Sequence, residues 1–450
     1  MTRPVPWEVV GDRTQKDHER MEVTIHRGTN EIGGSCVEVS AGGTRLILDV
    51  GMPLMDSDGE PFDLGSTRGK SAAQLLEEGV APKVAGLFGG GERPAAILLS
   101  HAHIDHSGLL HLTDPGIPIH ATKGTSKIML AGSLFAGQQN LDKKRFRELT
   151  PGEPFTIGAF RITPFPVDHS TFGCVAFLLE ADGKTLLYSG DLRWHGHQPE
   201  TIQALVGAVA PRRIDALVME GTHVGGTKQI GSTEAELVDQ IAAEIEGAKK
   251  LVLAHFSPIN VDRLLTCYRA TRKAGRVFVV DAYAAFVMHL LSRQIRVPWK
   301  PEGKGVRVLF NKAFLRKPIE KVVRRIDHAR IELDDILAEP EKHVMVFRPS
   351  MTRLDFAGNL PEGCRCIYSC WQGYLDKRDW VECQRDIERA GGDLVKRHVS
   401  GHIYQADLIR FVEALKPKQV IPIHTLDPRG FERLFPNATV LEDGQRSPIG

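Results

Sequence analysis

The chain has 450 residues, of which 42% are hydrophobic and 25% are charged, as is typical of a soluble globular protein. Its net charge of +1 argues against binding to nucleic acid through an overall basic field. The first residues have no apolar signal segment, and no apolar run is long enough to span a membrane, so we expect a cytoplasmic protein. Seven cysteines without CxxC spacing predict reduced thiols.

The first half of the chain is rich in predicted strands. Alternating or continuous apolar runs, separated by Gly-rich turns, occur at residues 21–28, 35–51, 94–100, 160–170, 174–191 and 215–222. Few helical patterns interrupt them. This strand-rich pattern predicts a β-sandwich with outer helices for residues 1–225.

After residue 225 the pattern changes to alternating helices and strands. Residues 232–250 and 261–275 are amphipathic helices, and residues 251–257 and 276–283 are strands. Such alternation predicts a parallel sheet over residues 226–395. Residues 396–450 then add a helix and a strand that ends at His424.

A cluster of metal-binding residue types follows the strand at 94–100. It reads H-x-H-x-D-H and comprises His101, His103, Asp105 and His106. His101 and His103 share a face if the segment is extended, so they can bind one ion. A helix starting near Ser107 would turn the other two toward a second ion. Each ion needs further ligands.

Further candidates for ligands each follow an apolar strand, as the first cluster does. They are His169, Asp191 and His424. Any one of them alone is more typical of a structural residue, but the joint pattern predicts a metal centre at the strand ends.

The cluster "HAHIDH" resembles the signature of the metallo-β-lactamase superfamily. The resemblance implies an α/β fold, the αββα sandwich, with two divalent metal ions. It assigns His101, His103 and His169 to one ion, Asp105, His106 and His424 to the other, and Asp191 to both. Asp49 would support the metal loop. Ligation by nitrogen and oxygen suits Zn²⁺ and tolerates Mn²⁺.

Asp191 and His424 are far apart in sequence, so a common site requires a domain inserted between them. Residues 226–395 supply it, and the arrangement resembles the β-CASP branch of nucleases. Glu220 in "LVMEGTH", His402 in "HVSGHIYQADL" and His424 in "IPIH" match further motifs of that branch. Their order and context are similar to those of the ribonuclease J family. A histidine at the last motif favours RNA over DNA.

This resemblance also implies a mechanism. A hydroxide bridging the two ions would attack phosphorus. The catalytic positions are Asp105, Glu220 and His402, and His402, oriented by Glu220, would protonate the leaving 3′-oxygen.

Two segments resemble the pocket for an RNA 5′-phosphate in ribonuclease J relatives, namely "AHFSPINVDRL" and "YSCWQGYLD". They imply contacts from Ser257, Asn260, Arg263, Ser369, Gln372 and Gly373. Asp262 departs from the family pattern by replacing a histidine, and its charge would repel phosphate unless Arg263 compensates. Exonuclease and endonuclease action therefore both stay open. Trp371 either stacks on a base or belongs to the core.

We therefore expect a metal-dependent ribonuclease acting on single-stranded RNA. The alternatives are a DNA nuclease, a hydrolase of small esters or thioesters, and a non-catalytic binding subunit. The basic segment 300–330 is either a solvated helix face or a phosphate-binding patch. The chain ends soon after His424, so we expect no further C-terminal domain, and a homodimer would form through other surfaces.

Overall fold

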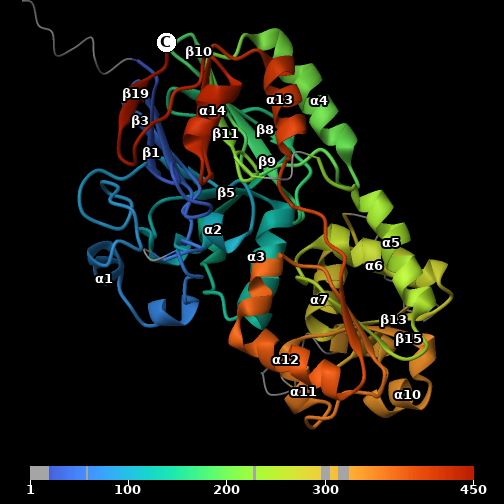
Figure 1. The fold of residues 1–450 in the computed structure, drawn as a ribbon. Coiled ribbons are helices and arrows are strands. Elements are labelled where there is room, and N and C mark those ends of the chain that lie inside the picture. Colours follow the sequence, from blue (N-terminus) through green and yellow to red (C-terminus); the bar gives the residue numbers. More distant parts are fainter. Residues whose placement is uncertain (1–19, 57–58, 227–229, 295–304, 313–323) are drawn as a thin grey trace, which may run out of the picture.

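The computed structural model describes residues 20–450 except 57–58, 227–229, 295–304 and 313–323. Much of the basic segment 300–330 therefore lies outside the described residues. Figure 1 shows two layered units, a sandwich of the blue, green and red parts of the chain and a second unit of its yellow and orange parts.

The first sheet of the sandwich has seven strands among the described residues, in the order β19-β1-β2-β3-β4-β5-β6. They are β1 (Glu22–Arg27), β2 (Cys36–Ala41), β3 (Thr44–Leu48), β4 (Ala96–Leu98), β5 (Ile119–Thr122), β6 (Phe146–Leu149) and β19 (Arg446–Pro448). Pairing is antiparallel from β19 to β3 and parallel from β3 to β6. The C-terminal strand thus returns to the edge of the N-terminal hairpin, which its short polar sequence did not predict.

The second sheet packs face to face on the first, in the order β18-β11-β10-β9-β8-β7. Its strands are β7 (Phe155–Ile157), β8 (Phe160–Pro166), β9 (Val175–Ala181), β10 (Lys184–Tyr188), β11 (Ala216–Glu220) and β18 (Gln419–Ile423). Alternate apolar residues of both sheets form the core between them. The outer face of the second sheet packs on α4 (Pro199–Val209), α13 (Gln405–Leu415) and α14 (Pro428–Leu434). The predicted sandwich with outer helices is confirmed.

The third sheet belongs to the second unit and is parallel throughout, in the order β14-β13-β15-β12-β16-β17. Its strands are β12 (Val252–His255), β13 (Val277–Asp281), β14 (Val306–Leu309), β15 (His343–Val346), β16 (Arg365–Tyr368) and β17 (Asp393–Lys396). One face packs on α5 (Glu234–Gly247), α6 (Val261–Lys273) and α7 (Ala282–Leu291). The other packs on α10 (Leu333–Ala338), α11 (Pro349–Leu354) and α12 (Arg378–Arg389). The predicted parallel sheet is confirmed.

Strand β13 ends at Asp281, two residues earlier than the predicted strand at 276–283. The Asp281 carboxylate accepts a hydrogen bond of 2.8 Å from the backbone N–H of Ala284 and so begins α7. The remaining short elements are α1 (Ala72–Glu77), α2 (Ile104–Ser107), and the 3₁₀ turns η1 (Leu64–Thr67), η2 (Leu110–Leu112), η3 (Lys143–Arg145), η4 (Ala210–Arg212), η5 (Asp327–Ala329), η6 (Pro340–Lys342) and η7 (Gln372–Asp376).

Helix α3 (Lys123–Phe135) joins the two units. It starts after β5 of the sandwich, and in Figure 1 it runs from there toward the second unit. The Phe135 ring stacks on Tyr283 of α7 at 5.1 Å, and Lys127 Nζ donates to the Leu290 carbonyl at 2.6 Å. Residues of both units therefore share one hydrophobic core.

A buried ionic network forms a second connection, and Glu234 lies at its centre. Glu234, at the start of α5, accepts hydrogen bonds from Arg193 of the sandwich at 3.1 Å and from Arg263 of α6 at 2.9 Å. All three side chains are fully buried. Thr266 Oγ1 also donates to Glu234 at 2.7 Å. Buried charges of this kind are tolerated only when each is paired.

We predict that Glu234→Gln lowers the free energy of unfolding by about 2–4 kcal/mol at pH 7, because two buried guanidinium groups lose a shared counter-charge. Burial raises the pKa of Glu234, but Arg263 and Arg193 outweigh it and hold that pKa well below its ordinary value. The stabilisation is therefore present at neutral pH and is lost as the pH falls below the ordinary range of a Glu carboxyl. Urea unfolding of both proteins at pH 7 and pH 4 measures this.

Glu246→Gln, on the exposed side of the same helix, is the control and should leave the free energy of unfolding unchanged. Equal stabilities of the wild type and Glu234→Gln at pH 7 would show that the network does not stabilise the fold.

Candidate metal centre

The candidate ligands lie where strands of the two facing sheets end. His101 and His103 follow β4, and Asp105 and His106 lie in α2. The prediction placed the start of this helix near Ser107, but it begins at Ile104, with His103 as its N-cap residue. The helix therefore presents Asp105 and His106 from its first turn. Residues His169, Asp191 and His424 follow β8, β10 and β18.

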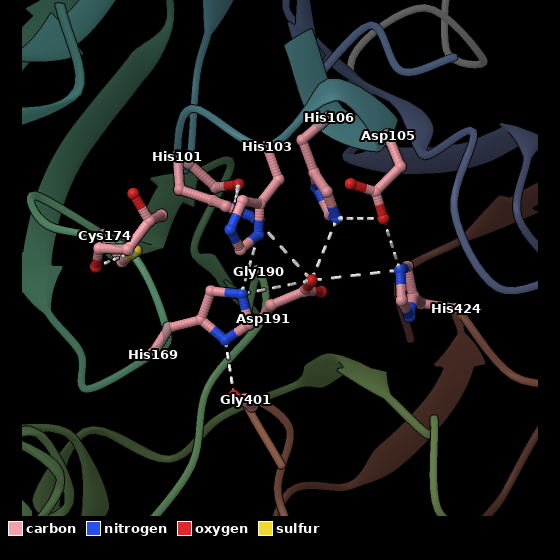
Figure 2. A network of polar contacts seen from close by, with 12 residues as sticks. His101, His103, Asp105, His106, His169, Cys174, Gly190, Asp191, Gly401 and His424 are labelled. Carbon is pink, nitrogen blue, oxygen red and sulfur yellow. Dashed lines mark hydrogen bonds and ion pairs between the residues drawn. The ribbon is translucent and has the colours of Figure 1, made fainter. Parts of the chain in front are cut away.

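Figure 2 shows that these side chains point toward one another. In a first group of His101, His103, His169 and Asp191, the potential ligand atoms all lie within 4.8 Å of one another. Nε2 of His101 is 3.1 Å from Nδ1 of His103, and Nε2 of His169 is 3.0 Å from the same atom. Nitrogen atoms this close to one another can bind a common cation.

A second group shares Asp191 with the first and adds Asp105, His106 and His424, again within 4.8 Å. Asp191 Oδ2 lies 3.1 Å from His106 Nε2. Asp105 Oδ2 lies 3.2 Å from His424 Nε2. The structure therefore brings the seven candidate ligands together, with Asp191 shared by the two groups.

The charge states of these residues suit a divalent cation. Burial lowers the pKa of His101 and His169 and lowers that of His103 to about 4, so these imidazoles are neutral at pH 7. Burial raises the pKa of Asp191, but the neighbouring histidines outweigh it, so the group is a carboxylate. Neither Asp191 oxygen accepts a hydrogen bond of ordinary geometry among the described residues. The buried Asp191 carboxylate, together with the neutral imidazoles of the first group, fits a metal site.

Asp49 holds two of the candidate ligands in position through hydrogen bonds. It is fully buried after β3 and accepts hydrogen bonds from the backbone N–H and the hydroxyl of Ser100, at 2.7 and 2.6 Å. Its Oδ2 also lies 2.8 Å from Nδ1 of His106 and accepts from the Tyr188 hydroxyl at 2.8 Å. Ser100 Oγ in turn lies 2.9 Å from Nδ1 of His101. Asp49 thereby fixes both imidazole rings with Nε2 toward the centre.

Two residues of the site have a left-handed backbone that is unfavourable for side chains other than Gly. They are Asp49 with φ of 60° and His424 with φ of 54°. Hydrogen bonds hold both: Asp49 N–H donates to the Leu98 carbonyl at 3.1 Å, and His424 N–H donates to the Gly28 carbonyl at 2.8 Å. Such strain is typical of functional sites and turns each side chain sharply out of its strand.

Glu220 and His402 lie beside the second group of ligands. Nδ1 of His402 is 3.2 Å from both Glu220 oxygens and 3.7 Å from Asp191 Oδ2. Burial lowers the pKa of His402, but the Glu220 and Asp191 carboxylates outweigh it and raise the pKa to about 9. His402 therefore carries a proton at neutral pH. Its side chain is 22% exposed, so substrate can reach it.

Sequence reasoning missed the polar residues that hold these groups in place. Thr222 Oγ1 donates to Glu220 at 2.9 Å and lies 2.9 Å from Nδ1 of His424, so it joins the two. Ser400 Oγ accepts from the His402 N–H at 3.0 Å and lies 2.7 Å from His223 Nε2. These residues lie within a few positions of predicted site residues, and this proximity was their only signal in the sequence.

Three of the six residues predicted to bind a 5′-phosphate, Asn260, Arg263 and Ser369, are buried. Arg263 is fully buried, and besides Glu234 it donates to the Ser369 carbonyl at 2.7 Å, the Ser369 hydroxyl at 2.6 Å and the Val399 carbonyl at 2.9 Å. Asn260 caps α6 by accepting from the Arg263 N–H at 2.9 Å. Asp262 pairs with Arg193, and not with Arg263 as considered above. Ser257 and Gln372 are exposed, and Gly373 is half-buried.

Comparison with known proteins agrees with this site. Residues 80–256 match the model of a β-lactamase superfamily domain, and residues 395–429 match that of a Zn-dependent metallo-hydrolase RNA specificity domain. The second match includes His402 and His424. No helix in the described part of the chain is long and apolar enough to cross a membrane.

A ribonuclease J of Mycobacterium tuberculosis is 22% identical over 420 residues, which cover 90% of this chain and 68% of that protein. An RNase J-like protein of Methanocaldococcus jannaschii is 23% identical and covers 58% of this chain and 57% of that protein. A crystal structure of a protein of unknown function from Enterococcus faecalis V583 has the same fold, with a TM-score of 0.75, 22% identity and coverage of 96% of this chain and 100% of that one. The chain therefore contains a metallo-β-lactamase domain and an RNA specificity domain and is homologous to ribonuclease J.

Proposed function

We propose that this protein is a metal-dependent ribonuclease that hydrolyses phosphodiester bonds of single-stranded RNA. The observation that carries the proposal is the buried double cluster of His and Asp ligands with the pair Glu220–His402 beside it. Homology to ribonuclease J and the match to an RNA specificity domain support RNA as the substrate. In this proposal residues 1–225 and 396–450 form one domain, and residues 226–395 are an inserted β-CASP domain.

Two divalent ions, most simply Zn²⁺, would be held by the two groups of ligands. His101, His103 and His169 would bind one, Asp105, His106 and His424 the other, and Asp191 would bind both. When bound, such ions lower the pKa of water so that hydroxide is available at neutral pH, and they offset charge on the phosphoryl oxygens. The absence of sulfur ligands agrees with Zn²⁺ or Mn²⁺.

His402 would serve as the general acid. Because the two carboxylates keep it protonated, it can donate a proton to the leaving 3′-oxygen. Glu220 accepts at Nδ1, which leaves Nε2 of the ring for the substrate. Glu220 is itself held by the Leu192 N–H at 3.1 Å and by Thr222, so the imidazole is oriented before substrate binds.

We further propose that cleavage does not require a 5′-monophosphate. The N–H donors of Arg263 are directed at Glu234, Ser369, Val399 and His398, so this guanidinium has none left for a ligand. The carboxylate of Asp262 adds negative charge near the same position. A terminal phosphate would gain no strong donor here, and the RNA chain would be bound along its length instead.

His103→Ala should remove bound metal and lower RNA cleavage by more than about a thousandfold, because one of three imidazoles of the first group is lost. Metal content by mass spectrometry and cleavage of end-labelled RNA measure this. His111→Ala changes an exposed histidine of the same segment and is the control. Retention of both metal and activity in His103→Ala would contradict the assignment.

His402→Ala should slow cleavage by about 10²–10⁴-fold while the metal content stays unchanged. Glu220→Gln should move the alkaline limb of the pH–rate profile to lower pH, because the protonated imidazole loses the carboxylate that raises its pKa to about 9. Glu413→Gln, exposed on α13, is the control. An unchanged alkaline limb in Glu220→Gln would exclude His402 as the general acid.

RNA of one sequence bearing a 5′-monophosphate, 5′-triphosphate or 5′-hydroxyl should be cleaved at rates within about threefold of one another. Matched DNA should be cleaved more slowly. Cleavage confined to the monophosphate RNA would contradict the proposed independence of the 5′ group. A metal-loaded protein that cleaves no nucleic acid would overturn the ribonuclease proposal.

A further inference from the structure

Two aromatic side chains of the second unit are unusually exposed. Trp371 is 52% exposed and Tyr374, in turn η7, is 38% exposed. No other Trp, Tyr or Phe among the described residues is as exposed. Their rings meet edge to face, with centroids 5.2 Å apart and an interplanar angle of 86°. Exposed aromatic rings cost free energy in water, so a pair of them needs an explanation.

The surrounding backbone holds this pair in place. The Tyr368 hydroxyl donates to the Trp371 carbonyl at 2.9 Å, and the Tyr374 N–H donates to the same oxygen at 3.2 Å. The indole lies directly over Gly373, where an added Cβ would come within 2.3 Å of the ring. Only glycine therefore allows this ring position. The aromatic surface is formed in advance and would lose little conformational freedom on binding a ligand.

Two hydrogen bonds connect the backbone beside this pair with the loop that contacts the candidate metal centre. Ser369, just before the pair, donates to the Arg397 carbonyl. Arg397 starts the loop in which the Gly401 carbonyl accepts a hydrogen bond from the metal-site residue His169.

A cation accompanies the aromatic pair. Lys377 Nζ lies 4.7 Å from the centroid of the Tyr374 ring, and the Lys377 side chain is exposed. A cation over a phenol ring is held by a cation–π interaction. Its ammonium group can also reach a phosphate of a chain that passes over the ring. Aromatic faces with an adjacent cation are the elements from which sites for unpaired nucleotides are built.

We propose that Trp371 and Tyr374 form a stacking platform for an unpaired base of the RNA substrate, with Lys377 contacting an adjacent phosphate. This inference rests on the proposed function. A protein partner is disfavoured, because the platform is small and carries a cation. Every base has an aromatic face, so the platform would bind RNA without sequence preference and hold the strand near the metal centre.

The test measures binding separately from cleavage. Fluorescence anisotropy with a labelled single-stranded RNA is recorded on protein freed of metal, so that the RNA stays intact. Trp371→Ala should weaken binding about tenfold, whereas Trp371→Phe should retain most of it. Leu337→Ala, which removes another exposed apolar side chain on α10 at the far end of the second unit, is the control. Lys377→Ala should reduce the salt dependence of binding, which Trp371→Ala should leave unchanged.

An RNA with one abasic position identifies the stacking contact. The wild type should lose affinity for the best-placed abasic RNA, and Trp371→Ala should show no further loss with it. Equal binding by the wild type and Trp371→Ala, or a change in self-association by Trp371→Ala without a change in RNA binding, would overturn the platform. Failure of the ribonuclease proposal is recognised separately, by wild-type protein that is loaded with metal and does not cleave RNA.

Discussion

The carboxylate of Asp191 imposes the strongest constraint on this structure. It is 2% exposed, and its Oδ2 lies 3.1–3.8 Å from a nitrogen of each of five histidines, namely His101, His106, His169, His402 and His424. Burying an ion without full compensation costs several kcal/mol. The imidazole groups around the carboxylate offset this cost, because they can carry a proton or bind a metal ion together with it. Strand ends of both sheets are needed for this, because no single strand could supply ligands from all sides.

Contacts between the two units position residues of the candidate site as well as stabilising the fold. Arg193, two residues after Asp191, donates to Asp168 at 2.9 Å and to the Ser400 carbonyl at 3.2 Å. Asp168 precedes the ligand His169, and Ser400 lies two residues before His402. Because Glu234 connects Arg193 to the second unit, displacement of that unit would disturb a candidate metal ligand and the proposed acid together. Stability and catalysis are therefore coupled through one guanidinium.

Much of this could be predicted from local sequence, and the reason is geometric. Candidate ligands such as His101 and Asp191 follow buried strands closely, so the apolar run that forms the strand also fixes where the side chain emerges. Partners such as Thr222 and Ser400 left no such signal, because each also contacts a histidine far away in the sequence, His424 and His223 respectively. For Arg263 the sequence suggested a role that the structural contacts do not support. Its residue type agreed with a phosphate site, but only the structure shows that Glu234 occupies its donors.

The pairing of Arg263 with Glu234 changes where binding energy for RNA can come from. A buried arginine that is already neutralised cannot provide a strong site for a terminal phosphate, and Asp262 makes the region less favourable for anions. In the proposed ribonuclease, affinity would then arise from contacts that any part of a strand can make, such as the proposed stacking on Trp371 and pairing with Lys377. Contacts of this kind do not distinguish an end from an interior position. The pairing of Arg263 and the charge of Asp262 therefore agree with the proposal that the RNA is bound along its length.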